Sequence, residues 1–199
     1  MRILIASLII CLHFSPASAQ TTGAGDITWL GLDFSQAAFI GSPEGGENIT
    51  NAAFRDKYTT AWNQAIMTQQ KQYNVAGMVH RTKVKYALDI TAKSNRSLQK
   101  NFFGYNVGDF SRLDAKKIGD LVSHYDFQGQ TGTGVLVFVE GMSAAQKEAG
   151  AWVTMVDMKT RKVILTTYKT GEAGGFGFRN YWAKAWANIL AAAGPDLKK

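Results

Sequence analysis

The sequence predicts a single α+β domain in which two or three helices pack on a mixed or largely antiparallel sheet of about five strands. Three observations support this fold class. The chain has 199 residues, of which 46% are hydrophobic and 19% charged, a composition typical of one globular domain. Its last third holds three segments rich in strand-forming residues, and apolar residues recur at helical spacing in three others. No internal repeat or linker divides the chain.

The first residues predict a signal peptide over 1–19. Arg2 supplies a cationic start, 3–12 is a nearly unbroken apolar run, and Ala17-Ser18-Ala19 has the small residues that precede a cleavage site. We expect cleavage between Ala19 and Gln20, which leaves 20–199 as one globular domain. The apolar run is shorter than the roughly 20 residues of a membrane span, so we expect no transmembrane segment in the mature chain. The predicted location is periplasmic or secreted.

The cysteine content and the net charge argue against several classes of functional site. The one cysteine, Cys11, lies in the predicted signal peptide, so the mature domain has no disulfide, zinc-thiolate site or cysteine nucleophile. Lysine and arginine outnumber aspartate and glutamate by 22 to 15, a net charge of +7. The basic residues are spread along the chain, which favours solubility and attraction to anionic surfaces over a nucleic-acid-binding arm.

The first half predicts two strands and a helix. Residues 27–34 alternate loosely and are rich in strand formers, and the strand can extend through 37–40. Thr50 or Asn51 can cap a helix that continues to about residue 70. Its apolar positions are Phe54, Tyr58, Ala61, Trp62, Ala65 and Ile66. Residues 83–91 alternate with a period of two and predict a half-buried strand.

The second half contains the clearest elements. After an irregular stretch over 95–109, residues 114–125 predict a helix with Ile118, Leu121, Val122 and Tyr125 on its apolar face. Strands are expected over 134–140, 151–157 and 162–168, the last two joined by an antiparallel turn over 158–162. A final helix over 178–193 carries Phe178, Trp182 and Trp186 on its buried side and stops at Gly194-Pro195.

The order of elements over 134–193, with the turn Asp157-Met158-Lys159-Thr160-Arg161-Lys162, resembles a group of exported bacterial α/β domains. This group includes the curli-secretion lipoprotein, the lipoprotein activators of penicillin-binding proteins and the amino-terminal domain of TolB. The resemblance covers about a third of the chain. It implies a periplasmic scaffold that docks on envelope proteins, and it implies no catalytic residue.

The block from Gly174 to Trp182 is a glycine-rich loop between a predicted strand and a predicted helix. Gly174, Gly175 and Gly177 with the helix N-terminus can hold a small anion, and Arg179 can add a positive charge. The spacing matches no nucleotide-binding motif. We favour a structural role, in which the small residues let the chain cross closely over the sheet while Phe176 and Phe178 fill the core.

The densest basic stretch runs from His80 to Lys85. Strand alternation would place Arg81, Lys83 and Lys85 on one face, where they can meet an anionic polymer. Export argues against nucleic acid as the partner. We favour the interpretation that these lysines protect a strand edge from aggregation.

The ionisable residues suggest no complete catalytic site. His80 and His124 lack the close spacing of a metal site, so we expect no metal and no cofactor. The strand-end acids Asp33, Asp89, Glu140 and Asp157 leave open an exported hydrolase that uses a carboxylate pair. The leading hypothesis is an exported, non-enzymatic envelope domain that binds an envelope protein or an anionic cell-surface component. Small-anion binding at the loop from Gly174 to Arg179 is the remaining alternative.

Overall fold

A computed structural model describes residues 26–42 and 49–198. The predicted signal peptide and its cleavage site lie outside these residues. The strands are β1 (Ile27–Asp33), β2 (Ala38–Ile40), β3 (Lys85–Tyr86), β4 (Phe103–Gly104), β5 (Thr133–Ser143), β6 (Glu148–Asp157) and β7 (Lys162–Glu172). The α-helices are α1 (Thr59–Thr68), α2 (Gln70–Tyr73), α3 (Val75–Met78), α4 (Asp89–Arg96), α5 (Ala115–Ser123) and α6 (Phe178–Ala193). A π-helical turn η1 (Ala53–Tyr58) and the 3-10 turns η2 (Val107–Phe110) and η3 (Gly194–Leu197) complete the described elements.

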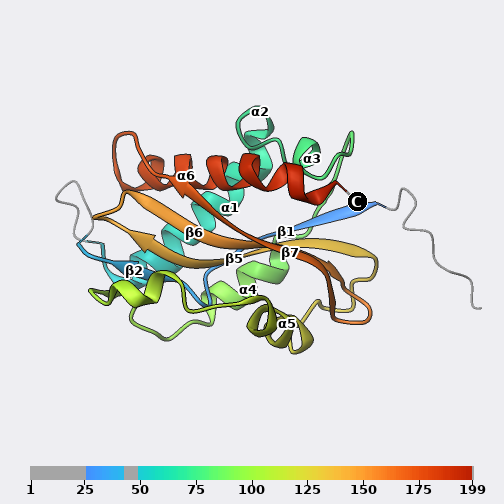
Figure 1. Ribbon diagram of the computed structural model, residues 1–199, viewed down its shortest axis with the longest axis horizontal. Helices are drawn as coiled ribbons and strands as arrows, with labels where there is room; N and C mark the ends of the chain where they lie inside the picture. Colours follow the sequence, from blue (N-terminus) through green and yellow to red (C-terminus); the bar gives the residue numbers. More distant parts are fainter. Residues whose placement is uncertain (1–25, 43–48, 199) are drawn as a thin grey trace, which may run out of the picture.

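Strand β5 lies at the centre of the sheet (Figure 1). One of its edges pairs in parallel with two separate strands, β1 along 133–138 and β2 along 141–143. β3 then pairs with β1, and β4 with β2, both again in parallel. The other edge of β5 pairs with β6, which pairs with β7, and both of these ladders are antiparallel. β1 and β2 therefore form one interrupted column beside β5.

The expected fold class, an α+β domain with a mixed or largely antiparallel sheet of about five strands and two or three helices, is wrong. Strands β1 to β5 all run parallel, in the order β3-β1-β5-β2-β4, and helices connect β2 to β3, β3 to β4 and β4 to β5. This is the connectivity of a parallel α/β fold. The sequence did not reveal it because β2, β3 and β4 are only two or three residues long, too short for a hydrophobic pattern.

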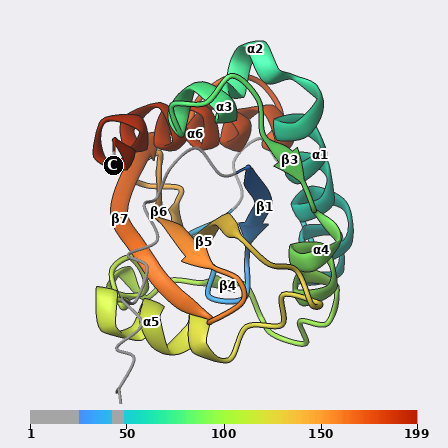
Figure 2. The ribbon, with the colours of Figure 1, turned by 90° about the vertical axis from the view of Figure 1, so that its right-hand side faces the viewer.

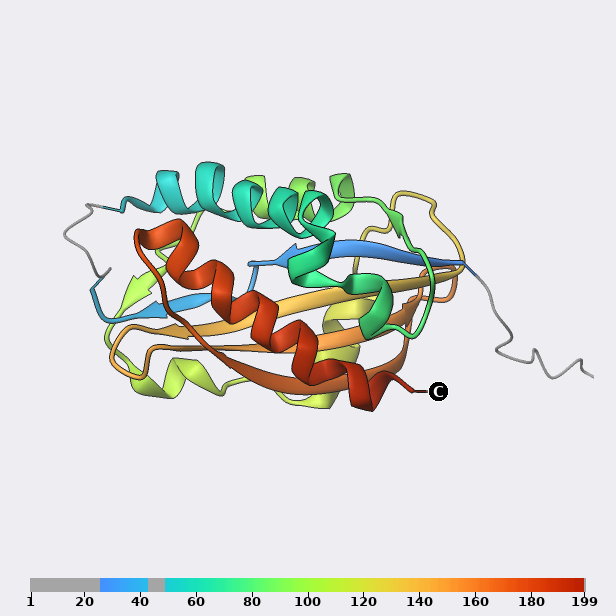
Figure 3. The ribbon, with the colours of Figure 1, turned by 90° about the horizontal axis from the view of Figure 1, so that it is seen from above.

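Helices cover both faces of the sheet. Helices α1 and α6 lie on one face, with α2 and α3 beside α6 (Figures 2 and 3). Their apolar side chains join those of β1, β5 and β6 in the larger of two buried clusters. Helix α5 covers the opposite face, where Ile118 and Val122 pack with Leu136, Phe138 and Val156 in the smaller cluster.

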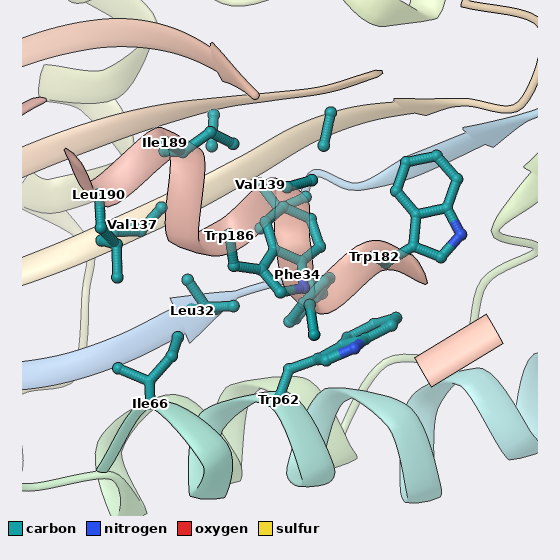
Figure 4. Packing of buried hydrophobic residues seen from close by; sticks show 14 of the residues in the cluster. Leu32, Phe34, Trp62, Ile66, Val137, Val139, Trp182, Trp186, Ile189 and Leu190 are labelled. Carbon is teal, nitrogen blue, oxygen red and sulfur yellow. The ribbon is translucent and has the colours of Figure 1, made fainter. Parts of the chain in front are cut away.

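Aromatic rings fill the larger cluster (Figure 4). Phe34, the residue directly after β1, stacks on Trp62 of α1 with ring centroids 5.5 Å apart. Trp186 of α6 meets both rings edge-on at 5.8 and 5.6 Å. Phe178, Trp182 and Trp186 are all buried, as the spacing in the sequence predicts. The two helices are thus held to the sheet by a shared aromatic contact.

The predicted strand over 83–91 is wrong. Only Lys85–Tyr86 is a strand, and helix α4 begins at Asp89. Because β3 pairs only with the first residues of β1, the rest of that edge is open, and α4 packs against it. The Thr91 hydroxyl donates to the carbonyl oxygen of Leu30 at 2.7 Å. The tertiary contact with β1 thus favours a helix from Asp89 onward, although apolar and polar residues alternate there as they do in a strand.

The bounds of the other elements agree more closely with those predicted from the sequence. The predicted strand over 27–40 is interrupted at 34–37, where the link between β1 and β2 lies. The stretch over 95–109, expected to be irregular, contains the end of α4, β4 and part of η2. The strands of the last third are present but longer than expected, the turn over 158–162 does join an antiparallel pair, and α6 has the predicted bounds 178–193.

Candidate functional site

The link between β1 and β2 brings several ionisable side chains together. Asp33, the last residue of β1, is fully buried. Its Oδ2 accepts a hydrogen bond from the Tyr125 hydroxyl at 2.5 Å, and its Oδ1 accepts one from the backbone N–H of Ser35 at 2.7 Å. Burial, and secondarily the Asp33 charge, raise the pKa of Tyr125 well above its ordinary value, so the hydroxyl keeps its proton at neutral pH.

Two cations hold the backbone of this link. Lys100 Nζ donates to the carbonyl oxygens of Ser35 at 3.2 Å and Ala37 at 2.7 Å. The Arg112 guanidinium donates through Nη2 to the carbonyl oxygen of Gln36 and, at 3.2 Å, to that of Glu140. Three successive carbonyl groups that have no strand partner are therefore satisfied by side chains. Burial, followed by repulsion from Arg112, lowers the pKa of Lys100.

Glu140 of β5 is the second fully buried acid on the α5 face. Its Oε1 accepts from the backbone N–H of Leu113 at 2.5 Å, and its Oε2 accepts from the Trp152 indole N–H at 3.0 Å. Nearby, burial and the Glu140 charge raise the pKa of Tyr168 to about 12. Glu140 thus fastens the segment before α5 to the sheet.

The four strand-end acids form no open carboxylate pair. Asp33 and Glu140 are enclosed and bonded to structural partners, so a substrate would have to displace these hydrogen bonds to reach them. Asp89 is exposed in the first turn of α4. Asp157 accepts from the backbone N–H of Thr160 at 2.9 Å and so stabilises the turn between β6 and β7. This arrangement favours structural roles for Asp33, Glu140 and Asp157.

The glycine-rich loop connects β7 to α6. Gly175 and Gly177 have φ angles of +114° and +76°, which glycine adopts without strain, and the N–H of Gly174 donates to the carbonyl oxygen of Tyr181 at 2.9 Å. Arg179 is exposed, and its backbone carbonyl accepts from the Trp62 indole N–H at 2.8 Å. The loop therefore packs on its own helix, and the first turn of that helix contacts α1.

The expectation that both phenylalanines of this loop fill the core is wrong for one of them. The Phe178 side chain is 2% exposed, whereas that of Phe176 is 94% exposed. The left-handed glycines on either side turn Phe176 outward, an effect that a hydrophobic pattern alone does not predict.

The loop between β7 and α6, which carries the exposed Phe176, and the segment that follows β4 lie toward the same end of the molecule, at the left in Figure 1. Phe39 of β2 contacts Phe103 of β4 at 5.3 Å and Phe178 of α6 at 5.7 Å between ring centroids, so the end of β4 and the start of α6 are neighbours. Tyr105 and Val107, which follow β4, are 79% and 78% exposed. We call Tyr105, Val107 and Phe176 the aromatic end.

The basic stretch does not form the predicted cationic face. Residues 81–84 are not a strand, and of the three cations only Lys85 lies in β3, where it forms an ion pair with Asp26 at 2.7 Å. Lys83 is exposed, and Arg81 is half-buried and donates to the carbonyl oxygen of His80 at 3.1 Å. Without a continuous strand, alternation cannot align the three side chains.

The two histidines lie in different parts of the fold. His80 Nε2 is 2.8 Å from the carbonyl oxygen of Gly194, and His124 Nδ1 is 2.9 Å from that of Asp120. Among residues 26–42 and 49–198, no three His, Cys, Asp or Glu side chains gather as a metal site would require. In the same part of the chain, no helix has the length and apolar character needed to cross a bilayer.

The residues that sequence reasoning missed are Lys100, Arg112 and Tyr125 as partners of the link between β1 and β2. Lys100 and Arg112 lie at least 63 residues along the chain from the carbonyl groups of the link that they contact, and Tyr125 lies 92 residues from Asp33, so no local spacing connects these pairs. The one local signal was Asp33 itself, an acid directly after an apolar strand.

Comparisons with protein-family models, curated proteins and solved structures find no match for this chain.

Proposed function

We propose that this chain is an exported, non-enzymatic domain that docks onto an envelope protein through its aromatic end. The observation that carries the proposal is that exposed apolar side chains lie on two segments at the same end of the molecule. Of the four large hydrophobic residues that are exposed in the described part of the chain, Tyr105, Val107 and Phe176 lie at the aromatic end. Grouped exposed apolar residues mark interaction surfaces more often than scattered ones do.

The way these residues are held also supports a docking role. Tyr105 directly follows β4, which pairs with β2, Val107 begins the 3-10 turn η2, and Phe176 lies two residues before α6. The exposed side chains are therefore presented by segments fixed to the core, which limits the conformational entropy lost on binding. Aromatic residues are enriched at the centres of protein interfaces. The buried hydrogen-bonded acids on the α5 face, by contrast, favour a scaffold over a hydrolase.

Export and docking are tested together in a cell that produces the full chain. The amino-terminal sequence of the mature protein should begin at Gln20. We then compare wild type with Phe176→Ser by chemical crosslinking of intact cells and mass spectrometry of the crosslinked species. Ile164→Ser is the matched control, because Ile164 is 48% exposed on β7 and lies outside the aromatic end.

The proposal predicts one defined crosslinked protein, whose yield falls about tenfold or more in Phe176→Ser and stays at the wild-type level in Ile164→Ser. Equal yields in both variants contradict the aromatic end as the docking surface. If the purified protein binds vesicles of anionic lipid through the same residues and no crosslinked protein forms, the partner is an anionic surface and the proposal of a protein partner is wrong.

A further inference from the structure

Two adjoining cavities line one side of helix α5. One has a volume of about 390 Å³ and the other about 410 Å³, and both are bordered by Gln36, Leu121 and His124. We call them together the α5 groove. Each is within the range of roughly 300–1,000 Å³ that is typical of sites for small molecules.

The α5 groove lies where the sheet is interrupted. Gln36 belongs to the link between β1 and β2, and α4 and α5 flank the second cavity. In open α/β sheets, ligands bind beside the carboxyl ends of parallel strands, where helices on the two faces diverge. The link that contains Gln36 lies at the carboxyl end of β1, and α1 and α5 lie on opposite faces of the sheet (Figures 1 and 2).

The lining combines an apolar floor with uncharged polar groups. Leu121, Ile90 and Phe138 supply apolar surface from α5, α4 and β5. The Gln36 amide and the Ser94 hydroxyl lie along the same cavity. His124 engages the carbonyl oxygen of Asp120 through Nδ1, so Nε2 is the ring nitrogen that can meet a ligand.

The charges that line the α5 groove cancel. Lys93 and Asp126 both border the second cavity and form an ion pair at 2.9 Å. Lys117 and Asp120 both line the first cavity, one helical turn apart on α5. An anionic ligand would lie beside Asp120, and a cationic ligand beside Lys117, so neither sign is favoured.

We propose that the α5 groove is a binding site for a neutral amphipathic small molecule. Its apolar body would rest on Leu121, Ile90 and Phe138, and its hydroxyl or amide groups would meet Gln36, Ser94 and His124. This site is independent of the aromatic end, because the two share no residue.

The binding test uses the neutral fluorescent probe N-phenyl-1-naphthylamine with the full mature protein. The probe is then displaced by octyl glucoside below its micelle concentration, by octanoate, or by octylammonium. The three competitors have the same alkyl chain and differ in the charge of the head group. We expect octyl glucoside to displace the probe at a concentration about tenfold lower than either ion, a difference of about 1.4 kcal/mol. Equal or better displacement by either ion overturns the proposal.

Two variants locate the bound probe. Leu121→Asn removes apolar floor and should weaken probe binding about tenfold. Gln36→Ala removes only an amide side chain at the surface and tests the site if Leu121→Asn fails to fold, which a thermal melt reveals. Val107→Asn at the aromatic end is the matched control and should bind like wild type. If Val107→Asn loses the probe and the groove variants keep it, the proposal is wrong.

Discussion

Asn63 of α1 and Asn95 of α4 donate hydrogen bonds to the same atom, the carbonyl oxygen of Leu32 on β1, each at 3.0 Å. Their side-chain oxygens accept in return from the backbone N–H groups of Leu32 at 2.7 Å and Phe34 at 2.8 Å. Both side chains are buried. Two amides from two helices thus provide the hydrogen bonds that a neighbouring strand would otherwise give to this edge of β1.

Replacing Asn95 with alanine should destabilise the fold by about 1–3 kcal/mol, because it leaves the buried N–H of Phe34 without a partner. Urea unfolding measures the loss. Asn188→Ala is the matched control: its amide also donates to a backbone carbonyl, that of Glu172 at 2.9 Å, but at an exposed position. We expect it to cost less than about 1 kcal/mol. Equal losses would mean that the edge of β1 does not depend on Asn95.

Gly31→Ala should cost about 3 kcal/mol or more. Gly31 has a φ of +109°, and a Cβ there would lie 2.5 Å from Asn63 Oδ1 and 2.6 Å from Thr91 Oγ1. Two causes contribute to this loss, the strain of a positive φ and the steric clash of the added Cβ. Gly129→Ala separates them, because Gly129 has a φ of +75° and no atom within 4 Å of the added carbon. The free energy of unfolding of Gly129→Ala should fall only by the cost of the backbone strain, about 1–2 kcal/mol. Similar values for both would show that the Asn63 and Thr91 side chains move aside freely.

Phe178→Ala and Phe176→Ala should differ sharply in stability although they lie two residues apart. The buried ring of Phe178 contacts Phe39, Tyr58 and Trp62, so its loss should cost about 3–5 kcal/mol. Phe176 is exposed, and its loss should change stability by less than about 0.5 kcal/mol. Thermal unfolding of the two variants checks this. A large loss in Phe176→Ala would show that this ring packs on the protein.

Alkaline pH should destabilise the fold through Tyr125. Its folded pKa is raised, whereas a tyrosine in the unfolded chain ionises near pH 10, so the folded state binds the proton more tightly. The stability that Tyr125 contributes is therefore complete below about pH 10 and declines as the pH rises further toward its folded pKa. For Tyr168, whose pKa is about 12, the decline continues to about that pH.

Urea unfolding between pH 8 and 11 tests this dependence. Above pH 10 the free energy of unfolding of Tyr125→Phe should fall less steeply with pH than that of wild type. The reason is that the hydroxyl that ionises at different pH values in the folded and unfolded states has been removed. Tyr105→Phe is the control, since the Tyr105 side chain is exposed, and it should follow the wild-type curve. An unchanged slope in Tyr125→Phe would contradict a raised pKa of the buried Tyr125 hydroxyl in the folded state.

The sequence predicted the long elements and failed on the short ones for a physical reason. Helix α6 and strands β5 to β7 carry enough apolar residues to show a period, and their positions were found. β3 and β4 have two residues each, and their place in the sheet depends on contacts with β1 and β2, more than 50 residues away in sequence. The parallel topology and the partners of Asp33 depend on the same long-range contacts. The outward turn of Phe176 depends instead on the φ angles of its neighbours.

The two cations at the link between β1 and β2 make the first part of the domain depend on later segments of the chain. Ser35, Gln36 and Ala37 accept hydrogen bonds from Lys100 and Arg112. β1 pairs along its length with β5. The carbonyl groups of the link and the edge of β1 that faces β5 therefore find their partners in segments from residue 100 onward. A fragment ending before residue 100 would leave these carbonyl groups and one edge of β1 without partners. We therefore expect the domain to unfold in one cooperative transition, and a fragment that ends before residue 100 to fail to fold on its own.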